Sequence, residues 1–158
     1  MSIQVLDCTL RDGGYINDWR FGRRTIASIL DKLENAKIDI IELADEKEPN
    51  NASVAEEALI KAKEGERVKA KIKPDDYVIA LAIDGISLDS PGLAKKIDSL
   101  ATQGHSSLCF IIGGSLGLDD SVLKMADLKL SFSSLTFPHQ LMRLILLEQL
   151  YRSFRIIK

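Results

Sequence analysis

Residues 108–117 read Leu-Cys-Phe-Ile-Ile-Gly-Gly-Ser-Leu-Gly, a short apolar run that ends in a glycine-rich segment. A short run without polar alternation is typical of a strand that is buried on both faces of a parallel sheet. Residues 77–83, Tyr-Val-Ile-Ala-Leu-Ala-Ile, form a second run of this kind. Amphipathic segments of helical period separate such runs, so the sequence predicts an α/β fold with a mostly parallel sheet flanked by helices.

The same patterns assign the other elements of the chain. Strands are expected at 3–6, 37–43, 77–83, 108–112 and 128–132, and helices at 23–36, 54–72, before Gly104, at 119–126 and from Pro138 onward. Residues 9–22 form a long first loop, and a further loop is expected around Asp84 and Gly85. Asn51 or Ser53 is expected to cap the second helix, and Thr136 the last one, with Pro138 at its first position.

Length and composition limit the possible classes of protein. A chain of 158 residues with 46% hydrophobic and 28% charged residues predicts one globular domain, 1–158. The net charge of −2 excludes nucleic-acid binding by bulk positive charge and leaves only a local basic patch. No apolar run approaches the roughly 18 residues of a membrane span, and no signal peptide is visible, so a cytoplasmic protein without membrane contact is expected.

The last helix is apolar in nearly every direction around its axis. Its apolar residues are Leu141, Met142, Leu144, Ile145, Leu146 and Leu147. A helix with this pattern is buried on more than one side, and the sheet of so small a domain covers only one of them. The sequence therefore predicts a homodimer through the C-terminal helix.

Two loops are candidates for ligand binding. Glycines at 113–117, between a strand and a helix, would let a ligand approach the backbone, although a plain strand-to-helix turn fits equally well. Residues 131–139 combine small hydroxyl groups with apolar neighbours, which suits a partly polar and partly aromatic ligand, and equally a capping loop. The 113–117 segment lacks the dinucleotide-binding glycine pattern.

Other reactive residues favour structural roles. His105 and His139 are not at metal-ligand spacing, and Cys8 and Cys109 lie in or beside strands, where core packing is expected. No nucleophilic triad or metal motif is visible, so no metal is expected and no catalytic residue is assigned. The basic residues after Phe137 suit either phosphate contact or the negative end of the helix dipole.

From about Ala36 onward the chain resembles a known family. The resemblance rests on 37–47, 64–67, 110–118, 130–133, 135–143 and 148–152, which read KIDIIELADEK, EGER, FIIGGSLGL, LSFS, LTFPHQLMR and EQLYR. These segments resemble the bacterial ribosomal RNA large subunit methyltransferase H family of the SPOUT (α/β-knot) superfamily. Several long matches in order across some 120 residues make this resemblance more specific than any single motif.

The resemblance implies a C-terminal trefoil knot, a homodimer and S-adenosylmethionine as cofactor. The cofactor-binding residues carried over by position are Leu81, Gly113, Phe132, Ser133, Ser134, Leu135, Thr136 and Phe137. The implied reaction is methylation of N3 of a pseudouridine in 23S rRNA of the assembled ribosome. Arg143 and Arg152 are weaker candidates for RNA phosphate contact, and either could serve the dimer instead.

The first 36 residues resemble a different family. Residues 5–15, with Asn17, Asp18 and Trp19, resemble the opening strand and loop of DRE-TIM metallolyases of the 4-hydroxy-2-oxovalerate aldolase type. There Asp12 would ligate a metal and Arg11 would steady an enolate. Lyase activity is not expected, because a (β/α)₈ barrel needs about 250 residues and the His-x-His metal pair is missing. The chain is therefore expected to be a chimera whose first segment completes the same sheet.

The end of the chain also departs from the methyltransferase family. That family continues past Lys158 with a short Arg-Gly-x-Pro-Tyr-His-Lys tail that reaches the cofactor and the RNA. The alternative to an active methyltransferase is therefore a catalytically inactive chimeric domain that folds, dimerises and binds S-adenosylmethionine.

Overall fold

The structure, a computed structural model, describes residues 1–7, 38–44, 46 and 51–158. Its elements in chain order are β1 (Ser2–Asp7), β2 (Ile38–Glu42), α2 (Val54–Lys69), β3 (Asp76–Ser87), α3 (Ser90–Thr102), β4 (Ser107–Ile112), α4 (Asp120–Met125), β5 (Leu128–Ser131) and α5 (His139–Ile157). The expectations for Cys8, the 9–22 loop, Arg11, Asp12 and the 23–36 helix lie outside the described residues.

The described strands form one five-stranded sheet in the order β2-β1-β4-β3-β5. Every neighbouring pair is parallel. The predicted α/β fold with a parallel sheet flanked by helices is therefore confirmed. The trefoil knot and the division of the chain into a single domain stay predictions.

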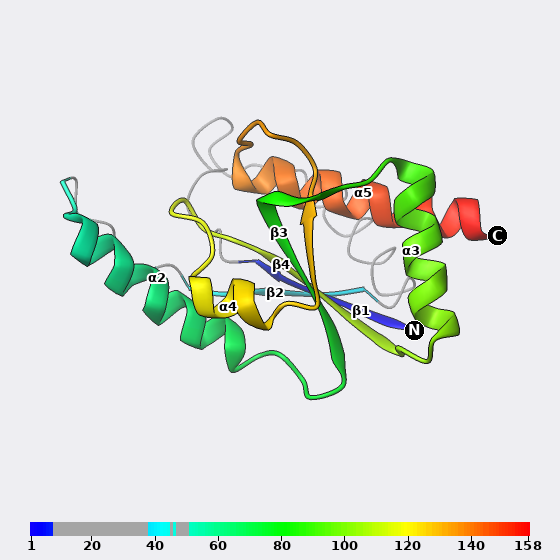
Figure 1. Cartoon of the computed structure of the whole chain (residues 1–158), viewed down its shortest axis with the longest axis horizontal. Helices are drawn as coiled ribbons and strands as arrows, with labels where there is room; N and C mark the ends of the chain where they lie inside the picture. Colours follow the sequence, from blue (N-terminus) through cyan, green and yellow to red (C-terminus); the bar gives the residue numbers. More distant parts are fainter. Residues whose placement is uncertain (8–37, 45, 47–50) are drawn as a thin grey trace, which may run out of the picture.

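Helices cover both faces of the sheet. Figure 1 shows α3 and α5 on one side of the strands and α2 and α4 on the other. Successive side chains of each strand point to opposite faces of the sheet, as the two-residue period of a strand requires. In β4, Phe110 packs in the cluster that contains α3 and α5, whereas Cys109 and Ile111 pack with Val68 of α2 and Val122 of α4.

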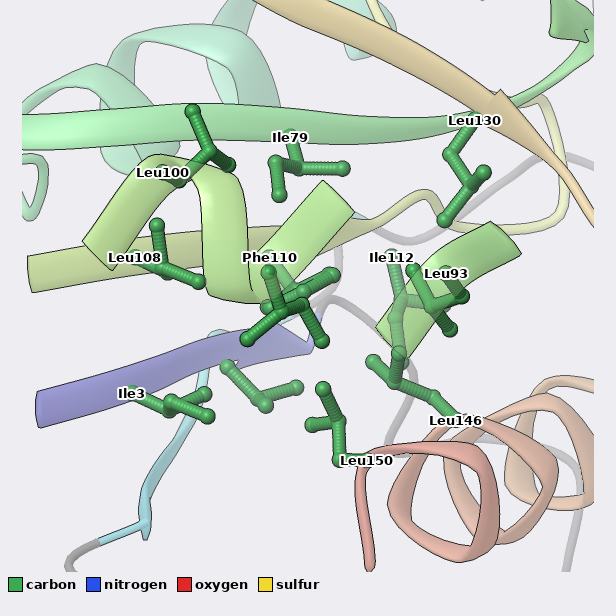
Figure 2. Close-up of a cluster of buried hydrophobic side chains, with 12 residues drawn as sticks. Ile3, Ile79, Leu93, Leu100, Leu108, Phe110, Ile112, Leu130, Leu146 and Leu150 are labelled. Carbon is green, nitrogen blue, oxygen red and sulfur yellow. The ribbon is translucent and has the colours of Figure 1, made fainter. Parts of the chain in front are cut away.

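The larger of the two clusters lies between the sheet and the pair α3–α5. Figure 2 shows Phe110 near its centre, with Ile3 of β1 and Leu146 and Leu150 of α5 around it. All four side chains are almost fully buried. Burial of a large apolar side chain contributes roughly 1.5–3 kcal/mol, so this cluster is a main source of stability for the described fold.

Local signals in the sequence account for several helix ends. The Ser53 hydroxyl accepts a hydrogen bond from the Glu56 amide, and the Glu56 carboxylate accepts one from the Ser53 amide; this capping box confirms Ser53 as the cap of α2. Gly104, just past α3, has φ +93°, the left-handed conformation that glycine adopts without strain. None of the described helices is both long and apolar enough to span a bilayer.

The prediction that the third strand ends at Ile83 and gives way to a loop is wrong. Strand β3 continues to Ser87, and its pairing with β5 shifts register between Leu81 and Ile86. A Cβ on Gly85 would lie 2.7–2.8 Å from backbone atoms of Lys129 and Leu130. Glycine here permits a bulge with close strand approach, where the Asp-Gly pair had indicated a turn.

The predicted start of the last helix is also wrong in detail. Pro138 is the N-cap residue of α5 and not its first helical residue, and no side chain caps this end. Thr136, the expected cap, lies two residues before Pro138. The helix at 54–72 ends earlier than expected, at Lys69, with Ala70 as its C-cap.

Replacing Gly85 with alanine is expected to destabilise the fold. The added methyl group would collide with the backbone of β5, and forced overpacking of this kind costs roughly 1–3 kcal/mol. Urea unfolding followed by circular dichroism measures the loss. Ser87→Ala, an exposed change in the same strand, is the control and should change stability by less than about 0.5 kcal/mol. Equal stability of the two variants would contradict the close approach.

Cys109 is expected to be unreactive in the folded protein. Burial, followed by the charge of Asp76, raises the pKa of its thiol from 9.0 to about 12. The folded state therefore holds the proton more tightly than the unfolded state, and stability falls as the pH rises from about 9 toward 12. In a Cys8→Ser background, alkylation at about pH 8.5 should follow the unfolding rate. Fast alkylation without denaturant would contradict this.

Candidate functional site

A cavity of about 550 Å³ lies at the carboxyl ends of β4 and β5, beside the middle of β3. Its lining residues come from 81–83, 112–118, 130, 132–133, 135–137 and 142. The cavity therefore brings together the two loops that the sequence marked as candidate ligand loops. Ligands of parallel α/β folds commonly bind beyond the carboxyl ends of the strands.

The first wall of the cavity is the loop 113–118 after β4. The Gly117 amide donates a hydrogen bond to the Gly114 carbonyl, 3.0 Å apart, and Gly117 has φ +79°. A Cβ on Gly113 would lie 3.0 Å from the Gly117 carbonyl carbon and 3.0 Å from Cγ of Leu118. Glycine at 113 thus lets the loop fold tightly against itself at the end of β4.

The second wall is the segment 132–137 after β5. The Ser133 hydroxyl accepts a hydrogen bond from the Leu135 amide at 2.9 Å. The buried Ser131 hydroxyl donates to the Ser133 carbonyl at 3.2 Å. These hydroxyl groups shape the loop by bonding to its backbone, so the serine-rich sequence has a local structural reason beside any role with a ligand.

Seven of the eight predicted cofactor residues line this cavity. They are Leu81, Gly113, Phe132, Ser133, Leu135, Thr136 and Phe137. Ser134, the eighth, is exposed and is not part of the lining. Its neighbours Ser133 and Leu135 do line the cavity, and a cofactor-binding role for this loop stays a prediction.

Other lining residues were not predicted. Met142 comes from the first turns of α5, and Leu118 follows the glycine loop. The sequence marked Met142 only as part of an apolar helix, because nothing in a helical pattern tells a cavity wall from a core contact. Ile83, two residues after Leu81 in β3, also lines the cavity, and its side chain is 60% exposed.

The lining is neutral. Among the described residues it contains no Asp, Glu, Lys, Arg or His, and its polar groups are the backbone and the hydroxyl groups of Ser115, Ser133 and Thr136. Asp119 follows the first wall and caps α4, and hydrogen bonds from the Ser121 hydroxyl and amide hold the pKa of its carboxyl below the ordinary value. The cavity can therefore bind a ligand through backbone groups and apolar contact, without an acid or base of its own among the described residues.

Helix α2 contacts the start of α4 and the segment that follows β2. A Cβ on Gly65 would lie 2.9 Å from Cβ of Asp119, so this glycine lets α2 pack closely against the start of α4. Nη1 of Arg67 donates to the Ala44 carbonyl at 2.8 Å, and Arg67 also pairs with Glu46. The Glu-Gly-Glu-Arg motif at 64–67 is thus accounted for by packing and loop contacts.

Two of the residues in the histidine and cysteine expectations, His105 and Cys109, are outside the cavity lining. The rings of His105 and Tyr77 meet edge to face, with centroids 4.9 Å apart, and Cys109 is fully buried, as expected of structural residues. The side chain of His139 lies outside the described set. Within the described ranges no three His, Cys, Asp or Glu side chains gather in a way that could hold a metal ion.

Both arginine candidates for RNA contact form ion pairs. Nη1 of Arg143 lies 2.6 Å from Oε1 of Glu42, at the end of β2. Arg152 pairs with Glu148 one turn earlier in α5, and its side chain is 53% exposed against 23% for Arg143. Arg152 is therefore the more accessible of the two.

Comparison with known proteins gives one consistent result. The family described as predicted SPOUT methyltransferase matches residues 18–158. Proteins named ribosomal RNA large subunit methyltransferase H are 56% identical over 140 residues in Bacillus pumilus (88% of each chain) and 64% identical over 120 residues in Clostridioides difficile (76% of each chain). The counterpart from Alkaliphilus oremlandii is 59% identical over 123 residues, 78% of this chain and 77% of its own.

The family match begins upstream of residue 36, where the sequence resemblance changes from one family to the other. It includes residues 18–36, which were assigned to the lyase-like segment, and leaves out residues 1–17. The chimeric origin of the first segment stays a prediction. The resemblance of residues 37–158 is confirmed, and the chain belongs to the SPOUT methyltransferase family, together with the ribosomal RNA large subunit methyltransferase H proteins.

Proposed function

We propose that this protein transfers a methyl group from S-adenosylmethionine to N3 of a pseudouridine in 23S rRNA of the assembled ribosome. The observation that carries the proposal is the cavity between the 113–118 and 132–137 walls in a chain of a methyltransferase family. The names of the relatives support ribosomal RNA as the substrate. Since bacterial ribosomes are cytoplasmic, the protein would act there.

The cavity fits this cofactor in size and chemistry. Its volume of about 550 Å³ lies in the range of small-molecule sites, roughly 300–1,000 Å³. Phe132, Leu135 and Phe137 offer apolar surface to an adenine ring, and backbone groups beside Gly113 offer hydrogen bonds without a side chain in the way. Ser134, which does not line the cavity, would support cofactor binding only through the backbone of the 132–137 loop.

The residues of the chain would act by alignment. S-adenosylmethionine held between the 113–118 and 132–137 walls would supply an electrophilic methyl group, with its sulfur as the leaving group. The 113–118 and 132–137 walls hold the donor in one orientation and exclude water, which supplies most of the rate advantage. The part of the lining that the structure describes offers no base for the N3 proton, and no catalytic residue is assigned to that step.

Contacts with the ribosome are proposed for the exposed side of α5. Arg152, whose side chain is 53% exposed, can reach a phosphate by exchanging its partner Glu148, because exposed ion pairs are weak. Arg143 is a lesser candidate, since its guanidinium is more covered and paired with Glu42.

A homodimer through α5 is part of the same proposal. The inner face of α5 carries the buried Leu146 and Leu150, whereas Leu144 and Tyr151 are 60% and 66% exposed. Leu141 and Ile156 add further exposed apolar surface to this helix. A second copy of the chain would bury these side chains, as the all-round apolar pattern predicts.

Gly113→Ala is expected to weaken cofactor binding. The methyl group would push the loop 113–118 outward by a few tenths of an ångström, and a loss of about 1.4 kcal/mol would lower affinity about tenfold. Calorimetric titration with S-adenosylmethionine gives the affinity. Gly104→Ala is the control. Alanine would be strained at the φ of +93° found there, but Gly104 lies near the other end of β4, and no atom lies within 4 Å of the new Cβ. It should lower stability and leave affinity unchanged.

Methyl incorporation into ribosomes that lack the modification tests the reaction itself. Incorporation into 23S rRNA at N3 of a pseudouridine is expected. Binding of S-adenosylmethionine without incorporation would favour the inactive chimeric domain, and no binding at all would overturn the proposed cofactor site.

Leu144→Glu combined with Tyr151→Glu is expected to yield a monomer. Each change adds a charge to exposed apolar surface of α5, where burial by a second copy would then be unfavourable. Sedimentation velocity at micromolar concentration distinguishes the two states. Leu59→Glu, on the exposed surface of α2, is the matched control and should remain dimeric. A monomeric unmodified protein would contradict the dimer.

A further inference from the structure

An ion pair connects the far edge of the sheet with the helix that forms part of the cavity. Nη1 of Arg143 donates to Oε1 of Glu42 at 2.6 Å, and the two residues are 101 positions apart in the chain. The Arg143 side chain is 23% exposed and that of Glu42 is 44% exposed. The pair is therefore a specific long-range contact at the surface and not a buried charge pair.

Glu42 lies in the same row of the sheet as the start of the first cavity wall. Asp7 of β1 is opposite Glu42 on one side and opposite Ile112 of β4 on the other. Ile112 itself lines the cavity and leads into Gly113. With strands about 4.8 Å apart, Glu42 is held roughly 10 Å from the base of the 113–118 wall by two rows of backbone hydrogen bonds.

Along the chain, Arg143 lies just beyond the residues that line the cavity. It follows Met142, which lines the cavity, and it is the fifth residue of α5. This end of α5 has no side-chain cap, and its first backbone bond runs from the Met142 amide to the Pro138 carbonyl, 3.1 Å apart. The Arg143 guanidinium thus anchors a helix start whose own sequence supplies no cap.

We propose that Glu42 and Arg143 are positioning residues that set the distance between the two cavity walls. The rigid row Glu42–Asp7–Ile112 fixes one wall, and the ion pair fixes the start of α5, and with it residues 132–142, relative to that row. This inference rests on the proposed function, since its consequence is the affinity for S-adenosylmethionine. It gives Arg143, which lies outside the cavity lining, a role in the geometry of the cavity, where the sequence had suggested contact with RNA phosphate.

The ion pair should matter for cavity geometry more than for overall stability. Partly exposed pairs contribute little to folding, because water and salt screen the charges. The affinity for a ligand held between two walls is more sensitive to loss of the pair than folding stability is, because a small displacement of one wall misaligns several ligand contacts at once. Loss of the pair is therefore expected to change ligand affinity while the unfolding transition stays nearly the same.

A double-mutant cycle with S-adenosylhomocysteine as the probe tests the inference. Glu42→Gln and Arg143→Gln are each expected to weaken binding about three- to tenfold, and the double variant no more than either single one. The exchange Glu42→Arg with Arg143→Glu should recover affinity to within about threefold. Glu148→Gln, which breaks the other α5 ion pair of similar kind, should leave affinity unchanged.

The outcomes separate the inference from the function on which it rests. Glu42→Gln and Arg143→Gln variants that are folded and bind the probe as tightly as the unmodified protein overturn the inference alone. An unmodified protein that does not bind the probe overturns the proposed function as well. An Arg143→Gln variant with normal probe affinity and a raised KM for ribosomes would indicate RNA contact in place of positioning.

Discussion

The parallel pairing of β4 with β3, and of β3 with β5, is the constraint on which the site depends. In parallel strands all carboxyl ends lie at one edge, so the loops after β4 and β5 leave the sheet in the same direction. The short segments 113–118 and 132–137 then face each other across β3 without a long connection. Antiparallel pairing would have separated them, and neither loop encloses a cavity alone.

The first strand shows how tolerant this arrangement is of sequence. Residues 2–7 lie outside the family match, yet β1 occupies an inner position between β2 and β4. Ile3, Val5 and Leu6 are fully buried, with Ile3 and Val5 on the α5 side and Leu6 on the α2 side. An apolar strand of the right length and direction meets the demands of this position, because its pairing is made by backbone groups.

Periodicity predicted most of the described elements, since apolar runs and caps report local preferences. It failed where a distant backbone decided the outcome. Asp84-Gly85 has the composition of a turn, but β5 approaches so closely that the chain continues as a bulged strand. Thr136 has the chemistry of a cap but lies in the cavity wall, because α5 begins only after Pro138.

The sequence by itself determined the alternation of strands and helices, the family and the two glycine- and serine-rich loops, because each rests on neighbouring residues or on ordered matches. Only the tertiary structure decided that these loops share one cavity, that Met142 lines it and Ser134 does not, and that Arg143 meets Glu42. Such contacts join residues up to a hundred positions apart, and their geometry depends on strand order and register, which no local pattern encodes.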